Sequence, residues 1–159
     1  MAQRRSRLLI SHRYSSIYPG FLQEIGPYFL EEGMRYKKGD TLFENPYSWD
    51  KESHLLFLES PAGVGYSVNT DKNYTHTDQS TAKDNMDALL DFFTKYSEFS
   101  SNNLWLAGES YAGKYIPDLA KLIDEYNALG EGKKVNLKGI LVGNGIMSFE
   151  NGHLEEDQM

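Results

Sequence analysis

Three short apolar runs lie along the chain, at residues 55–58, 104–107 and 139–143. Continuous apolar runs of this length are typical of strands buried on both faces, as in a parallel sheet. The first run is stopped by Pro61 and Gly63, and the second is closed by Gly108. We therefore predict three buried strands at these positions.

Two longer segments between the runs carry apolar residues at helical spacing. The first begins at a cap formed by Thr77 or Asp78 and reaches about Tyr96, and the second follows Gly108 and ends before Gly130. Strands that alternate with helices of this size predict βαβ units, so the expected class is α/β, with a mostly parallel central sheet flanked by helices. The stripes comprise Ala82, Met86, Leu89, Leu90 and Phe93 in the first helix and Ile116, Leu119, Ala120, Ile123 and Tyr126 in the second.

The beginning of the chain departs from this pattern. Residues 27–46 hold short mixed segments separated by turn signals, which predicts a β-meander or hairpin. Residues 1–19 combine Arg and Ser with one apolar cluster at residues 8–10, which is too short for a signal peptide. We interpret residues 1–19 as an atypical, ill-fitting or disordered segment, with a transit peptide as the alternative. Residues 20–159 are expected to form one partial domain.

Composition narrows the function classes. The 159 residues include 16 basic and 23 acidic side chains, for a formal net charge of −7. This balance argues against nucleic acid as a partner, because binding it requires a clustered basic face. No apolar run approaches the roughly 18 residues of a membrane span. The chain has no cysteine and no His and acidic residues at metal-ligand spacing, so neither a metal nor another cofactor is expected.

The junction of the second predicted strand and the second helix carries the most specific motif. It reads Gly108-Glu109-Ser110-Tyr111-Ala112-Gly113, which has the form of a nucleophile elbow with Ala112 in place of the usual last Gly. Small residues are needed there because the serine backbone is strained and two segments pass close by. The turn would lift the Ser110 hydroxyl clear of the sheet's carboxyl edge. There the helix N-terminus favours negative charge, and the Tyr111 N–H can point at a developing oxyanion.

Five ordered blocks of the chain resemble the serine carboxypeptidase family. The similarity runs from about Gly20 to Ser148. It implies an α/β-hydrolase with a mixed central sheet, and an enzyme that releases the C-terminal amino acid of a peptide through an acyl-enzyme. The blocks are Glu-Ile-Gly-Pro-Tyr at residues 24–28, Asn-Pro-Tyr-Ser-Trp at 45–49, Glu-Ser-Pro-Ala-Gly-Val-Gly-Tyr-Ser at 59–67, the elbow segment at 108–117 and Gly-Asn-Gly at 143–145.

The resemblance also implies roles for individual residues. Ser110 would be the nucleophile, activated by a histidine base, and Tyr111 would donate one oxyanion-hole N–H from its backbone. Glu24 and Glu109 match the family's paired carboxyls, which share a proton and recognise the substrate's terminal carboxylate. Two carboxyls held close cannot easily both ionise, so the protonated member donates a hydrogen bond at acidic pH and loses it as the pH rises. The implied partners are the C-termini of peptide or protein substrates.

Other parts of the family pattern are missing from the sequence. In α/β-hydrolases the triad follows the order Ser, Asp or Glu, then His. Only His153 lies downstream of Ser110, in a polar tail. By resemblance, the family's Asp and His lie far beyond Met159, and its Gly-Gly-Pro-Gly-Cys segment is replaced here by residues 8–19. We therefore expect a truncated carboxypeptidase, and we do not expect activity from this chain alone.

Two alternatives to a peptidase remain open from the sequence. One is a catalytically incompetent remnant that binds peptides or partners weakly, and the other, within the same fold, is an acyltransferase or esterase. For the compartment, the resemblance implies the secretory pathway, with the vacuole, the lysosome or the extracellular space as destination. The glycosylation sequon Asn73-Tyr74-Thr75 gives this route slight support.

Overall fold

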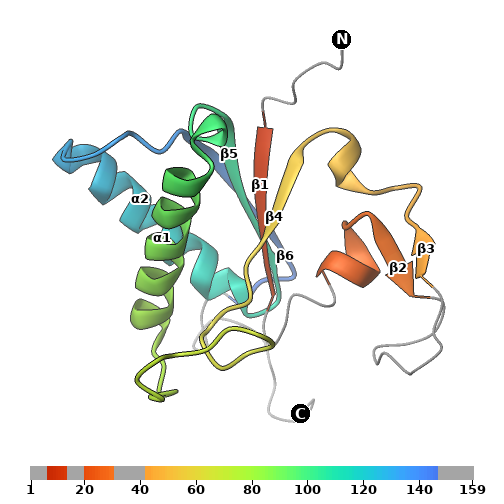
Figure 1. Ribbon diagram of the computed structural model, residues 1–159, viewed down its shortest axis with the longest axis horizontal. Helices are drawn as coiled ribbons and strands as arrows, with labels where there is room; N and C mark the ends of the chain where they lie inside the picture. Colours follow the sequence, from red (N-terminus) through yellow and green to blue (C-terminus); the bar gives the residue numbers. More distant parts are fainter. Residues whose placement is uncertain (1–6, 14–19, 31–41, 147–159) are drawn as a thin grey trace.

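A four-stranded parallel sheet forms the centre of the computed structural model, which describes residues 7–13, 20–30 and 42–146 (Figure 1). Its strand order is β4-β1-β5-β6, and a second sheet pairs β2 with β3 in antiparallel fashion. The expected α/β class with a parallel central sheet is thus confirmed. The elements in chain order are β1 (Arg7–Arg13), η1 (Gly20–Glu24), β2 (Tyr28–Leu30), β3 (Leu42–Glu44), η2 (Trp49–Lys51), β4 (His54–Phe57), α1 (Asp78–Lys95), η3 (Ser97–Phe99), β5 (Asn103–Glu109), α2 (Ala112–Leu129) and β6 (Leu137–Gly143).

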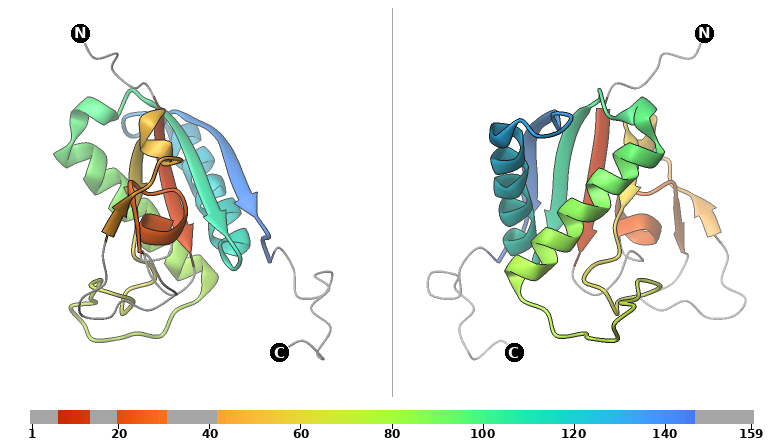
Figure 2. Two further views of the ribbon diagram at one scale, coloured as in Figure 1. Left: turned by 90° about the vertical axis from the view of Figure 1, so that its right-hand side faces the viewer. Right: turned by 60° about the vertical axis from the view of Figure 1, so that its left-hand side comes forward.

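The two α-helices pack against each other on one face of the main sheet. The short η1 turn and the β2–β3 hairpin lie on the opposite side, as the views in Figures 1 and 2 show. The expected flanking by helices therefore holds for one face. Within the described residues, η1 contacts β1 on the other side of the sheet, where the β2–β3 hairpin also lies.

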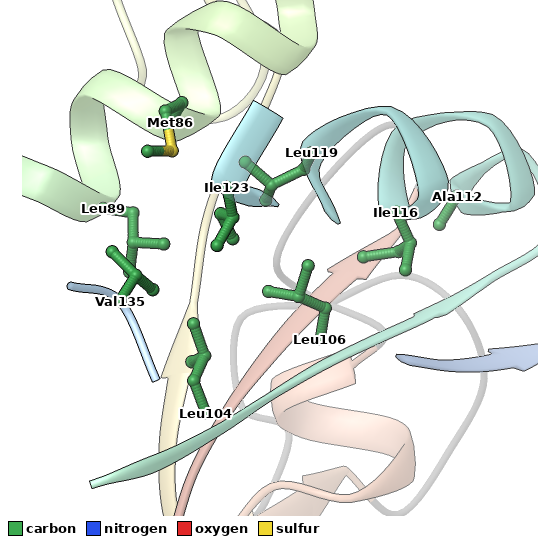
Figure 3. Packing of buried hydrophobic residues seen from close by; sticks show 9 residues of the cluster. All are labelled: Met86, Leu89, Leu104, Leu106, Ala112, Ile116, Leu119, Ile123 and Val135. Carbon is green, nitrogen blue, oxygen red and sulfur yellow. The ribbon is translucent and has the colours of Figure 1, made fainter. Parts of the chain in front are cut away.

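The hydrophobic core lies between the helices and β5 (Figure 3). Leu104 and Leu106 of β5 are completely buried against it, and they alternate with Trp105 and Ala107, which face the other side. Because the apolar residues of each helix recur at helical spacing, they form one stripe, and this stripe faces the two leucines. The cluster comprises Met86, Leu89, Leu104, Leu106, Ala112, Ile116, Leu119, Ile123 and Val135.

The ends of both α-helices follow from local side chains. The Ser80 N–H donates to Thr77 Oγ1 at 3.1 Å, and the Thr77 N–H donates to Ser80 Oγ at 2.9 Å, which makes Thr77 the N-cap of α1 in a capping box. Helix α2 ends at Gly130, whose φ of 67° suits a residue without a Cβ. Both helices predicted from the sequence are confirmed. Among the described residues, no helix is long and apolar enough to cross a membrane.

The predicted meander or hairpin is present as β2 and β3. Tyr28 pairs with Glu44, and Leu30 pairs with Leu42. The connection, with the turns expected at Gly33 and at residues 38–40, lies outside the described residues.

Strand β1 is the largest departure from the sequence-based expectation. Residues 7–13, which we expected to belong to an ill-fitting or disordered segment, pair in parallel with β4 on one side and β5 on the other. The backbone ladders with two neighbours order this segment, and no local pattern reveals such partners. The boundary between residues 1–19 and 20–159 remains a prediction.

Edge positions explain a second difference. All three apolar runs were expected to be buried on both faces, but β4 and β6 lie at the two edges of the main sheet. The residues of β4 are half-buried, and Ile140 and Leu141 of β6 are each 41% exposed. An edge strand has a neighbour on one side only, so its side chains keep more contact with solvent. The run length predicted the strands but not their positions in the sheet.

The packing of α2 leads to a stability prediction. Leu119→Ala should lower the free energy of unfolding by about 2–5 kcal/mol, because Leu119 is 1% exposed and its truncation leaves a cavity. Leu129 lies in the same helix but is 68% exposed, so Leu129→Ala should stay within about 0.5 kcal/mol. Chemical denaturation of both variants measures the difference, and equal losses would contradict the described packing.

Candidate active site

Ser110 occupies the two-residue turn between the end of β5 at Glu109 and the start of α2 at Ala112. Its φ of 60° lies in the left-handed region, which a residue with a Cβ rarely adopts. The strand–turn–helix context expected for a nucleophile elbow is therefore present. Such strained conformations persist only when their surroundings hold them in place.

Three backbone hydrogen bonds hold this turn. The Ser110 N–H donates to the carbonyl of Gly143 at 3.1 Å. The Ser110 carbonyl accepts from the N–H groups of Gly113 at 3.0 Å and of Ile146 at 2.9 Å. The end of β6, which pairs with β5, and the segment after it thus hold the backbone of Ser110 in place.

Gly113 allows this close approach. A Cβ added to it would lie 2.8 Å from both the N and the O of Ile146 and 2.9 Å from the carbonyl carbon of Gly145. Ala112, which stands where the common motif has its last glycine, is completely buried in the core cluster. The tight contact is therefore made one residue later than the motif suggests.

The side chain of Ser110 is half-buried, and within the described residues no hydrogen bond engages its hydroxyl. The next residue, Tyr111, is held firmly: its hydroxyl donates to Asp78 Oδ1 at 3.1 Å, and its ring lies 5.1 Å from that of Tyr115. Tyr111 is the N-cap of α2 and makes no side-chain cap bond. The positive end of the helix is therefore not capped by a side chain next to Ser110.

Glu24 and Glu109, far apart in the sequence, line one open hollow of about 490 Å³. Glu24 comes from the end of η1 and is exposed, whereas Glu109 is the last residue of β5 and half-buried, with its Oε2 atom buried. The hollow thus brings together the two glutamates that the sequence singled out, whereas Ser110, the residue after Glu109, is not among its lining residues. The other lining residues are Ile25, Trp49, Ala107, Gly108, Leu141, Val142 and Gly143.

Asn45 is a positioning residue that the sequence analysis did not single out. Its side-chain amide donates to the carbonyls of Glu24 at 3.0 Å and Gly26 at 2.9 Å, and its Oδ1 accepts from Tyr47 N–H at 2.9 Å. Only 6% of Asn45 is exposed, so the amide is a buried and satisfied clamp on the segment that carries Glu24. The available signals were the turn-forming dipeptide Asn45-Pro46 and the family-like block at residues 45–49, which gave Asn45 no role of its own.

The histidines with described side chains are engaged elsewhere. The ring of His54 packs edge-on against Phe99 at 4.9 Å. His76 Nε2 lies 2.7 Å from the carbonyl oxygen of Ala62, and because a carbonyl only accepts, that nitrogen carries the proton. His153, interpreted as a tail residue, lies outside the described part of the chain. In the part that is described, no cluster of three or more His, Cys, Asp or Glu side chains could hold a metal ion.

Comparison with known proteins decides the family. The sequence pattern that defines the family described as "Serine carboxypeptidase" matches residues 14–157. The chain belongs to the serine carboxypeptidases. Similar relatives include serine carboxypeptidase-like 44 of Arabidopsis thaliana, which is 48% identical over 140 residues, and the lysosomal protective protein of Mus musculus, which is 44% identical over 131 residues.

A solved carboxypeptidase has the same fold. The crystal structure of Kex1ΔP, a prohormone-processing carboxypeptidase from Saccharomyces cerevisiae, matches with a TM-score of 0.77 at 31% identity and covers 89% of this chain. The fold is therefore that of an α/β-hydrolase, as the sequence predicted.

This carboxypeptidase chain is much shorter than its relatives. It spans 28% of the Arabidopsis relative, 25% of the mouse relative and 31% of the yeast structure, while those matches cover 86%, 82% and 89% of the chain itself. The whole relatives therefore contain much that these residues do not represent.

The clamp around Ser110 leads to a prediction about two glycines of this serine carboxypeptidase. Gly113→Ala should destabilise the chain by about 1–3 kcal/mol, because its Cβ would meet backbone atoms that cannot rotate away. Gly143→Ala is the matched control, since its Cβ would meet nothing closer than 3.9 Å. Thermal or chemical unfolding measures both, and a Gly113→Ala variant as stable as Gly143→Ala would contradict the close approach.

Proposed function

We propose that this chain carries the nucleophile and the carboxylate-recognition pair of a serine-type carboxypeptidase, an enzyme that releases the C-terminal amino acid of a peptide. The observation that supports this proposal most is the left-handed backbone of Ser110 on a strand–turn–helix junction. A structural turn at this place would favour glycine or asparagine. A serine in a conformation that costs about 1–3 kcal/mol fits a role in the chemistry.

In the proposed reaction, Ser110 Oγ attacks the carbonyl carbon of the last peptide bond. Its proton passes to a histidine base and then to the departing amino acid, and water releases the acyl group in the second half of the cycle. The negative charge that develops on the carbonyl oxygen is stabilised by the backbone N–H of Tyr111 at the N-terminus of α2. The bond between the Tyr111 hydroxyl and Asp78 supports this role, because it restrains the residue that carries the donor.

The hollow shared by Glu24 and Glu109 is the proposed site for the substrate's terminal carboxylate. At acidic pH one carboxyl of the pair is protonated and donates a hydrogen bond to the substrate anion, and this donor disappears as the pH rises. The apolar residues of the same hollow, among them Trp49 and Leu141, offer contact to the side chain of the departing amino acid.

The histidines whose side chains the structure describes do not supply a base for Ser110 in this proposal. His54 is packed against Phe99 and His76 is bonded to Ala62, so neither is available to Ser110 in this arrangement. A serine without a base is a poor nucleophile. The alternative function is therefore binding of a peptide without catalysis. Binding needs no base, and the hollow offers a place for it. An esterase or acyltransferase would use the same nucleophile with another substrate or acceptor.

The proposed compartment is the secretory pathway, with the lysosome, the vacuole or the extracellular space as destination. Its support comes from the relatives, one of which is named a lysosomal protective protein.

The role of Ser110 is testable in a chimera that supplies the missing parts. Residues 14–157 replace the matching segment of the yeast carboxypeptidase Kex1, and release of C-terminal amino acids is measured. We expect activity that Ser110→Ala lowers by more than about a thousandfold, because the nucleophile is lost. Ser101, an exposed turn serine before β5, is the matched control, and Ser101→Ala should retain activity. A chimera whose activity survives Ser110→Ala would contradict the proposal.

A serine-directed phosphonate separates catalysis from binding in the chain alone. Covalent labelling that Ser110→Ala abolishes supports residual reactivity. Absence of labelling at acidic and neutral pH, together with binding of a peptide, favours the binding-only alternative.

The paired carboxyls predict a pH-dependent affinity. A peptide with a free C-terminus should bind about tenfold more weakly at neutral than at acidic pH, because the hydrogen bond to its carboxylate is lost. Glu109→Gln should flatten this dependence, since an amide donates at any pH. Calorimetry or NMR titration measures both.

Two controls accompany this titration. A peptide amide has no terminal carboxylate, and its affinity should not follow pH in this way. Glu131→Gln changes an exposed glutamate outside the hollow and should leave the profile of the free peptide unaltered. The same profile in Glu109→Gln as in the unmodified chain would refute carboxylate recognition by this pair without affecting the test of Ser110.

A further inference from the structure

The loop between β4 and α1 carries the chain's single Asn-x-Ser/Thr triplet, Asn73-Tyr74-Thr75, with tyrosine rather than proline in the middle. A triplet of this kind is an acceptor for N-linked glycans when the chain enters the secretory pathway. A proline at the middle position would prevent transfer of the glycan, and none is present here. The sequence requirement is therefore met at this one triplet.

Exposure of the acceptor is the first structural requirement. Asn73 and Thr75 are both exposed, and Tyr74 is 49% exposed. The loop leads into the N-terminal end of α1 and lies at the lower edge of the fold in Figure 1. A glycan is large and strongly hydrated, so the folded chain accommodates it only where the asparagine faces solvent. Asn73 satisfies this condition without any rearrangement.

The conformation of the triplet is the second observation. Asn73 Oδ1 accepts from the Thr75 N–H at 3.0 Å, and the Asn73 carbonyl accepts from the Asn69 side-chain amide at 2.9 Å. The side-chain oxygen is thus turned back over the triplet. The side-chain amide nitrogen of Asn73, Nδ2, makes no hydrogen bond to any described residue. Nδ2 is the atom to which a sugar would be attached.

The ring of the middle residue, Tyr74, packs on an earlier part of the same loop. Gly63 has a φ of 95°, and a Cβ on it would lie 2.7 Å from Cδ1 of Tyr74, so the ring covers this glycine. Two residues after the triplet, Thr77 opens α1 with its capping box. The triplet is therefore held by contacts within its own loop and precedes the N-cap of α1, and Asn73 Nδ2 makes no hydrogen bond to a described residue.

We propose that Asn73 is a site of N-linked glycosylation. The donor is a polyprenyl diphosphate-linked oligosaccharide, and the transferase of the secretory pathway catalyses the reaction. Asn73 Nδ2 forms a bond to the anomeric carbon of the first sugar and gives up one proton. The bond between that carbon and the diphosphate oxygen breaks, and the lipid diphosphate leaves with the electron pair. The inference rests on the secretory route proposed above, but not on the catalytic role of Ser110.

The test is translation of the full chain behind a cleavable signal peptide in the presence of sealed endoplasmic-reticulum microsomes. We expect a protease-protected product with a single upward shift on gel electrophoresis, which N-glycosidase removes while converting Asn73 to aspartate. Asn73→Gln, Thr75→Ala and Tyr74→Pro should each abolish the shift, whereas Thr75→Ser should retain it.

Two further variants keep the result specific. Thr70→Ala, an exposed position on the same loop but outside the triplet, should leave the shift in place, as should Ser110→Ala. A protected product without the shift, or a shift that survives Asn73→Gln, would overturn the proposal. A chain that remains accessible to protease despite the signal peptide would overturn it as well, because it would remove the route on which glycosylation depends. None of these outcomes changes the labelling or the hydrolysis that tests Ser110.

Discussion

Ser110 has a φ of 60°, in a backbone region that its Cβ disfavours by roughly 1–2 kcal/mol. It stays there because three segments converge on the same turn: β5 ends one residue before it, α2 starts two residues after it, and the segment that follows β6 bonds its carbonyl through Ile146. Gly113 has no side chain and so allows the last of these segments to approach. The rest of the site depends on this clamp.

One turn orients three chemical groups because they are consecutive. Glu109 lines the hollow, Ser110 carries a hydroxyl on the turn next to it, and Tyr111 carries a backbone N–H at the N-terminus of α2. Glu24 reaches the same hollow from another element, and the buried amide of Asn45 fixes its backbone. Two rigid pieces, the turn and the Asn45 clamp, therefore bring together carboxyls that are distant in the sequence.

Local patterns predicted the parts of the fold that depend on local interactions. Helix α1 was found from its cap at Thr77 and its apolar stripe, and the elbow was found from the small residues around Ser110. Strand β1 was missed because its strand character comes from two neighbouring strands and not from its own composition. The exposure of Leu141 was missed for a related reason: strand order decides which run lies at an edge, and strand order is a non-local property. The pairing of Glu24 with Glu109 came from the family resemblance, because nothing near either residue predicts that the two line one hollow.

Comparing Ser110→Gly with Ser110→Ala by equilibrium unfolding tests the strained turn most directly. Glycine adopts a positive φ at little steric cost, so the account predicts that Ser110→Gly is more stable than Ser110→Ala by about 1 kcal/mol. At a position with ordinary backbone geometry, glycine would instead be less stable than alanine by roughly 0.5–1 kcal/mol. That opposite order would contradict a left-handed Ser110 and the site assembled around it.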